Sequence, residues 1–116
     1  MTGLEIVLIS SLTLTSYRAV PEQTDDSPTI TSIGHYVHPY GTAVSQDLLR
    51  SGEICYGDIL LVPQYGFKVV NDTMHPRIKR GVDIFVETLA QEREVGVRRN
   101  QRMTLIKSPK RRCMKK

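Results

Sequence analysis

The sequence predicts a mainly β domain, in which about six short strands and one short helix form a small closed barrel. Short apolar segments recur along the chain, separated by clusters of Gly, Pro, Asn, Asp and Ser, which is typical of strands joined by turns. Only one segment, 86–95, suits a short helix. The 116 residues suit a single domain, and a hydrophobic content of 40% without Trp is typical of a soluble globular protein.

The first predicted strand is the apolar segment 4–17. Leu12 and Leu14 alternate with threonines, as expected where one face of a strand is buried. A secretion signal is the alternative, but the segment carries Glu5, lacks a basic start and has no small-residue cleavage site. We therefore interpret the segment as a strand. No apolar run in the chain reaches the roughly 18 residues of a membrane span.

Two loops and a hairpin are expected next. Residues 18–32 are rich in Pro, Asp, Ser and Thr, and residues 35–40 lie between two glycines, so both segments are predicted to be irregular. Residues 58–63 form a short apolar run that stops at a proline. A turn at 64–66 then leads into a second strand over 66–71, which predicts a hairpin.

The rest of the chain adds two strands and the helix. Residues 82–86 are an apolar run of strand length, and the helix is expected within 86–95, with Gly96 as its C-terminal stop. Residues 97–106 then close the barrel as a final strand. Three basic side chains of this strand are expected to be exposed: Arg98, Arg99 and Arg102.

Asp83 is the first candidate for a catalytic residue, because it interrupts an apolar run. In a strand, Asp83 and Phe85 share one face while Ile84 faces the other way. Loss of hydration beside an aromatic ring raises the pKa of a carboxyl group, which suits a general acid near neutral pH. A solvated aspartate on an edge strand is the alternative. A second aspartate, Asp72, precedes it by eleven residues.

Charge is distributed unevenly along the chain. Residues 1–92 hold six Lys and Arg against eleven Asp and Glu, whereas residues 93–116 hold ten against one. The ending 107–116 has no apolar periodicity, so we divide the chain into a barrel domain, 1–107, and a basic tail, 108–116. Such a tail attracts polyanions or an acidic protein face, or it serves only for solubility. It has no aromatic residue for stacking on bases.

The histidines and cysteines do not predict a metal site, and we expect no metal and no cofactor. His35 and His38 are three residues apart, but a nearby proline and two glycines argue against a helix, and nothing places His75 beside them. Cys55 and Cys113 lack metal-ligand spacing, and a disulfide between them remains open.

Several short motifs follow one another in a characteristic order: Thr15-Ser16-Tyr17, 22–28 (Glu-Gln-Thr-Asp-Asp-Ser-Pro), 30–34 (Ile-Thr-Ser-Ile-Gly), 43–49 (Ala-Val-Ser-Gln-Asp-Leu-Leu), Gly57-Asp58, 70–73 (Val-Asn-Asp-Thr) and 82–85 (Val-Asp-Ile-Phe). Together they resemble the three-aspartate ("3D") domain, a family similar to the catalytic domain of membrane-bound lytic transglycosylase A. The resemblance covers about residues 10–107. It implies a six-stranded double-psi β-barrel and is compatible with a phage-encoded member.

The resemblance also implies an activity, which is cleavage of peptidoglycan between N-acetylmuramic acid and N-acetylglucosamine to give a 1,6-anhydro product. Asp83 matches the family's single acid/base. Asp72 matches an aspartate that binds the substrate and raises the pKa of Asp83 through its like charge. One carboxylate suffices because the C6 hydroxyl of the substrate is the nucleophile, whereas a hydrolase needs a second carboxylate.

The sequence departs from the family in two places. Residues 74–79 replace a glycine-rich loop with a bulkier and more basic one. Ser45 stands where the family's first aspartate is usual, and Asp47, on the same face if the segment is extended, is its expected substitute. The candidate substrate-binding residues are Ser45 and Asp47 together with Thr15, Tyr17, His75, Arg77 and Lys79.

Three functions therefore stay open. The first is a lytic transglycosylase that acts on peptidoglycan glycan strands. The second is a non-catalytic barrel, a structural or docking component of a phage virion (tail or neck), whose basic tail 107–116 contacts other virion proteins. The third is nucleic-acid binding through residues 93–116. The location expected from the first two is a phage virion or the bacterial cell envelope.

Overall fold

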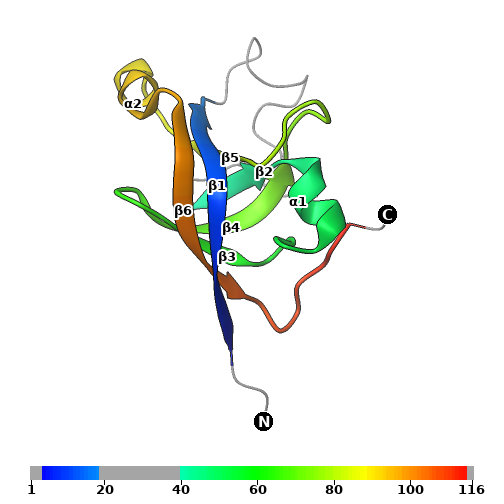
Figure 1. Ribbon diagram of the computed structural model, residues 1–116. Coiled ribbons are helices and arrows are strands. Elements are labelled where there is room, and N and C mark those ends of the chain that lie inside the picture. Colours follow the sequence, from blue (N-terminus) through cyan, green and yellow to red (C-terminus); the bar gives the residue numbers. More distant parts are fainter. Residues whose placement is uncertain (1–3, 19–39, 115–116) are drawn as a thin grey trace.

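The computed structural model describes residues 4–18 and 40–114 (Figure 1). In these ranges the strands are β1 (Glu5–Tyr17), β2 (Gly41–Val44), β3 (Ile59–Val62), β4 (Gly66–Thr73), β5 (Gly81–Phe85) and β6 (Arg98–Lys107), and the helices are α1 (Gln46–Ser51) and α2 (Leu89–Val95). The strands close into a barrel in the order β1-β5-β2-β4-β3-β6. The mainly β fold with a six-stranded barrel, predicted from the sequence, is confirmed.

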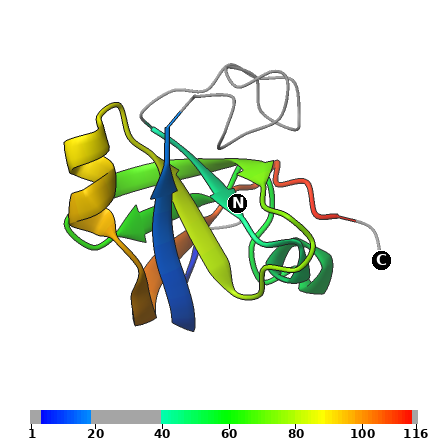
Figure 2. The same cartoon turned by 90° about the horizontal axis from the view of Figure 1, so that it is seen from above.

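The barrel is mixed in strand direction. The pairs β1–β5 and β2–β4 are parallel, whereas the other neighbouring pairs are antiparallel. This arrangement is compatible with a double-psi barrel. The predicted hairpin is present as β3 and β4, with a turn in which Gln64 and Gly66 both have a positive φ. The two helices lie on opposite sides of the barrel (Figures 1 and 2).

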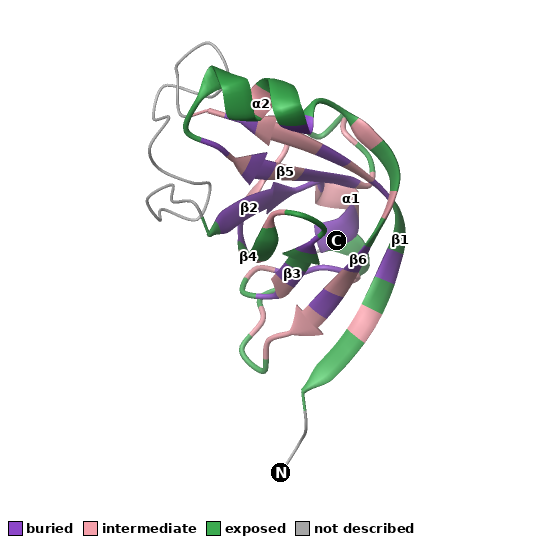
Figure 3. Ribbon diagram, turned by 90° about the vertical axis from the view of Figure 1, so that its left-hand side faces the viewer, coloured by how far each residue is buried: buried purple, intermediate pink, exposed green. Residues whose placement is uncertain are grey.

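The core fills the barrel interior, and the alternation predicted for residues 82–86 is present. Val82 and Ile84 of β5 are buried, whereas Asp83 and Phe85 are only half-buried. Leu12 and Leu14 of β1 are fully buried, so the interpretation of residues 4–17 as a strand holds. The purple bands in Figure 3 show this alternation on the strands.

β1 is long enough to pair with two neighbouring strands over different parts of its length. Its first half pairs with β6, and the residues from Thr13 onward also pair with β5. Between the halves the register with β6 shifts, and Ser11 and Asn100 have positive φ angles at this irregularity. A bulge of this kind bends both strands. The N-terminal half of β1 therefore extends beyond the rest of the barrel (Figure 3).

The helix expected within residues 86–95 is α2. Thr88 caps its N-terminus through a hydrogen bond from the Gln91 N–H, the Gln91 side chain bonds back, and Gly96 follows the last turn. The six-residue α1 is an additional helix, so the extended conformation on which the predicted placement of Asp47 depended is not present. Its consecutive residues Leu48 and Leu49 are both fully buried, and they anchor the helix to the core.

The prediction that Arg98 of β6 is exposed is wrong. Arg99 and Arg102 are exposed as expected, but Arg98 is half-buried. Its guanidinium lies 5.3 Å from the centre of the Tyr65 ring and donates a 3.0 Å hydrogen bond to the Tyr65 hydroxyl. The hydrocarbon stem and planar head group of arginine suit this stacking on an aromatic face.

The described part of the predicted basic tail packs against the barrel. Asp58 is fully buried and accepts hydrogen bonds from the Ser108 N–H and from the Arg111 guanidinium, the latter at 2.7 Å. A disulfide joins Cys55 to Cys113. The segment that follows β6 is therefore fixed at two points, through a buried ion pair and a covalent link.

Some predictions fall outside the described residues. The loop over 18–32 and the excursion over 35–40 do so apart from Arg18 and Tyr40, and this includes His35 and His38. Within the described ranges, neither helix is long and apolar enough to cross a membrane.

Candidate functional site

Four residues form a transverse row of the barrel wall. Asp83 of β5 lies in register with Thr15 of β1 on one side and with Ala43 of β2 on the other. Ala43 is in turn in register with Asp72 of β4. Because the residues on either side of Asp83 are buried in the core, its side chain faces away from the interior. The backbones of the two aspartates are separated by two strand spacings, about 10 Å.

The environment of Asp83 favours its protonated form. Its pKa is raised from 3.8 to about 6, mainly by burial and in smaller part by the negative charges of Glu92 and Asp72. The Thr15 hydroxyl opposes this by donating a 2.8 Å hydrogen bond to the carboxylate. A carboxyl group that titrates near pH 6 can give and take a proton at neutral pH. Glu92 belongs to α2, and no sequence pattern placed it near Asp83.

Tyr17 lies at the same end of β1. Burial raises the pKa of its phenol, and the negative charges of Asp72 and Asp83 add to the rise. Its ring packs edge to face against Phe85, with the ring centres 5.8 Å apart. The Tyr17 hydroxyl therefore stays neutral beside the two carboxylates, where it can serve as a hydrogen-bond donor.

An open pocket of about 430 Å³ adjoins Thr15. Three of its lining residues carry a positive charge, and no residue of the lining carries a carboxylate. Arg77 and Lys79 were predicted as substrate-binding residues, whereas Arg99 was foreseen only as an exposed residue of the last strand. The lining consists of Thr13, Thr15, Met74, Arg77, Ile78, Lys79, Gly81, Val97 and Arg99. Such a pocket suits a ligand with anionic groups.

Ser45 and Asp47 do not line this pocket. Ser45 is fully buried, and its hydroxyl accepts a 2.9 Å hydrogen bond from the Gly81 N–H. Asp47 accepts from the Arg80 N–H at 3.1 Å and 3.2 Å. Burial tends to raise the pKa of Asp47, but hydrogen bonds from the Ser45 hydroxyl and from backbone N–H groups lower it overall. Both side chains therefore fix the start of β5.

His75 is exposed on the loop between β4 and β5. Its Nδ1 atom accepts a 3.1 Å hydrogen bond from the Arg77 N–H, so its ring folds back onto its own loop. The structure thus groups Thr15, Tyr17, Asp72 and Asp83, places Arg77 and Lys79 in the adjoining pocket, and leaves His75 beside it.

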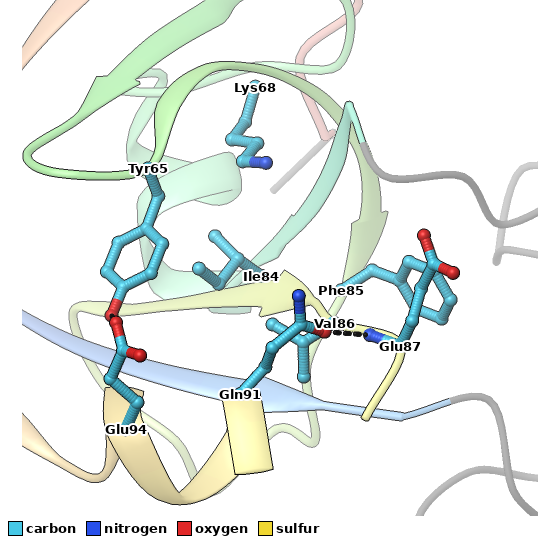
Figure 4. Close-up of a pocket in the computed structure, with 8 residues that line it drawn as sticks. All are labelled: Tyr65, Lys68, Ile84, Phe85, Val86, Glu87, Gln91 and Glu94. Atoms are coloured by element: carbon cyan, nitrogen blue, oxygen red, sulfur yellow. Dashed lines mark hydrogen bonds between the residues drawn. The ribbon is translucent and has the colours of Figure 1, made fainter. Parts of the chain in front are cut away.

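A second pocket, of about 240 Å³, opens between the β3–β4 turn and α2 (Figure 4). Its lining includes Tyr65, Lys68 and Glu94, and burial lowers the pKa of Lys68. None of the predicted site residues lines it. In the described part of the chain, no three His, Cys, Asp or Glu side chains gather as a metal site would require.

Comparison with known proteins gives no family for this chain: no family model and no curated protein sequence matches it.

Proposed function

We propose that this barrel is a lytic transglycosylase, which cleaves the bond between N-acetylmuramic acid and N-acetylglucosamine in peptidoglycan. The observation that carries the proposal is the half-buried Asp83 carboxyl group, whose pKa is raised to about 6. The Asp83 side chain faces away from the barrel interior and accepts a hydrogen bond from Thr15. Thr15 also lines the pocket of about 430 Å³ that contains Arg77, Lys79 and Arg99. A single titrating carboxyl group is enough for this reaction, since the substrate supplies the nucleophile.

In the proposed reaction, the protonated Asp83 donates its proton to the glycosidic oxygen as the bond from that oxygen to C1 breaks. The resulting carboxylate then takes the proton of the C6 hydroxyl, and O6 bonds to C1 to close the 1,6-anhydro ring. The negative charges of Asp72 and Glu92 help the carboxyl group to retain a proton before the first step. The Thr15 hydroxyl stabilises the carboxylate between the two steps.

The pocket beside this row supports an anionic substrate. Arg77, Lys79 and Arg99 line a space of about 430 Å³, and no residue with a carboxylate lines it. The stem peptides of peptidoglycan carry carboxylates, and arginine binds a carboxylate through paired hydrogen bonds. Substitution of these three residues by glutamine should therefore weaken substrate binding more than it slows the bound reaction.

The disulfide between Cys55 and Cys113 is a further supporting observation. Disulfides persist mainly in oxidising surroundings outside the cytoplasm, and peptidoglycan also lies there.

The test is incubation of the purified protein with isolated peptidoglycan sacculi, followed by mass spectrometry of the released fragments. The native protein should release anhydro-muropeptides, and Asp83→Asn should release none while remaining folded by circular dichroism. Glu87→Gln, which neutralises an exposed carboxylate outside the row, is the control and should keep its activity. Fragments with reducing ends, or no fragments from the folded native protein, would contradict the proposal.

A structural role in a phage particle is the second candidate. It is favoured by Ser45, which stands at the position where the resemblance leads one to expect an aspartate. The Ser45 hydroxyl accepts a hydrogen bond from the Gly81 N–H inside the protein. It is also favoured by an apolar face on the barrel wall, described below. Under this alternative the sacculus assay gives no products, and the protein is instead retained in purified virions.

A further inference from the structure

The wall formed by β1, β6, β3 and β4 carries two rows of mainly apolar side chains on its outer surface. Strand register places the members of each row side by side. Within the rows, Ile6 and Leu8 are each 62% exposed and Phe67 is 57% exposed. We call these eight residues the outer apolar face: Ile6, Ile106, Ile59 and Val69 in the first row, and Leu8, Thr104, Leu61 and Phe67 in the second.

The outer apolar face is contiguous across four strands. From the strand spacing and the two-residue repeat along a strand, eight neighbouring positions cover about 260 Å² of sheet. Side chains that protrude from the sheet expose more area than that. The largest apolar patch on a typical monomer covers about 300–600 Å² and often has a function, so this face is a candidate for an interaction surface.

Within the described residues, the same wall ends in an open strand edge. The first half of β1 pairs with β6 on one side. On its other side, β5 begins to pair only at Thr13, and no other strand of the described ranges pairs with residues 5–9. Figures 1 and 3 show this half of β1 extending past the barrel. Its outward N–H and C=O groups form a template for another strand.

We propose that the chain forms a two-fold symmetric dimer, in which the first half of β1 pairs antiparallel with the same segment of a second copy. With the two-fold axis at Ile6, this residue faces Ile6 of the second copy, and Leu4 faces Leu8. Leu4 is 64% exposed, so each of these cross-strand pairs on the outer surface joins two exposed apolar side chains. These pairs cover part of the exposed apolar area of Leu4, Ile6 and Leu8, whereas the other residues of the outer apolar face lie outside the interface.

A second copy fits this edge in charge as well as in pattern. Glu5 is the only charged residue within 4–10, and it bonds to Lys107 of its own chain at 3.0 Å. In the proposed register it faces Val7 of the second copy, so two glutamates do not oppose each other. Identical strands satisfy such a register on both sides at once because the interface is two-fold symmetric. Thr15 lies nine residues from the axis, about 30 Å along the strand, so the dimer leaves the candidate site open and does not depend on the proposed function.

Sedimentation equilibrium of the native protein tests the dimer directly. We expect a reversible dimer that dissociates on dilution, and a monomer at every concentration up to about 0.5 mM would overturn the proposal. Ile6→Lys places two like charges on the axis and should weaken dimerisation at least about tenfold. Val97→Lys alters a side chain that is 61% exposed elsewhere on the barrel, so it should leave the dimer intact. Equal weakening by both variants would refute the interface.

A cysteine pair tests the register. Both native cysteines are in the disulfide, so an introduced thiol is the only free one. Ile6→Cys places two thiols in directly opposed positions, whose Cβ atoms are about 5 Å apart, and mild oxidation should link the two copies. Leu8→Cys has the same exposure, but its two thiols are offset by four residues, about 14 Å, too far for a disulfide. Equal linking of both variants, or linking of Leu8→Cys alone, would overturn the register.

Discussion

Replacing Asp83 with asparagine should stabilise the protein at neutral pH. Burial raises the pKa of this carboxyl group from 3.8 to about 6 in the folded protein. Between these values the folded state binds more protons than the unfolded state, so the free energy of unfolding falls as the pH rises. The rise in pKa corresponds to about 3 kcal/mol once the group is ionised in both states. Asparagine never ionises, is close in size to aspartate and can still accept the Thr15 hydrogen bond, so it avoids most of this cost.

The measurement is urea denaturation of the native protein and of Asp83→Asn over a series of pH values. At about pH 8 the variant should be more stable by about 1–3 kcal/mol, the upper value being the full cost of ionisation. Below about pH 4 the native carboxyl group is protonated in both states, so the difference should disappear. The linear dependence on urea gives each free energy of unfolding.

Asp47→Asn is a control of opposite sign. Although burial tends to raise the pKa of Asp47, hydrogen bonds lower it overall, so its ionised form stabilises the fold. This variant should lose stability near neutral pH, and the loss should fade as the pH falls through the folded pKa. If Asp83→Asn gave a constant difference at every pH, or was the less stable protein at pH 8, the assignment of a desolvated carboxyl group at Asp83 would be wrong.

Asp72→Asn should lower the pKa of Asp83, because it removes a negative charge that raises it; an unchanged carboxyl titration by NMR would contradict this coupling. Thr15→Val should move the same titration to higher pH, since it removes the hydrogen bond to the ionised form; a downward shift would exclude that role. Cys113→Ser should reduce the free energy of unfolding by about 2–4 kcal/mol, because a loop of this length is no longer closed in the unfolded chain. Denaturation without reductant measures the loss, and an unchanged midpoint would show that the disulfide does not stabilise the fold.

The strands could be predicted from the sequence because buried and exposed residues alternate along a strand. In residues 82–86 the alternation of apolar and polar positions placed Asp83 on the opposite face from the core, and β5 has this alternation. Gly66 marked the turn of the β3–β4 hairpin for a similarly local reason, since glycine adopts the positive φ of this turn without steric cost.

Features that depend on distant contacts were harder to predict. The helix α1 spans only six residues, too few to show a helical period, and it is held by the burial of Leu48 and Leu49. The C-terminal residues have the composition of a tail, but the buried carboxylate of Asp58 holds Arg111 against the barrel. A sequence does not reveal a partner that lies 53 positions away.

By itself, then, the sequence determined that this chain is a mainly β barrel and that Asp72 and Asp83 are unusual among its acidic residues. Only the tertiary structure decided which side chains surround them. The register of β1, β5, β2 and β4 brings Thr15 to Asp83 and places Ala43 between the two aspartates. That register follows from closing the barrel around a common core. It sets the pKa of Asp83 through burial, through the hydrogen bond from Thr15, and through the charges of Glu92 and Asp72. Periodicity indicates which face a residue occupies, whereas the contacts of that face depend on every other strand.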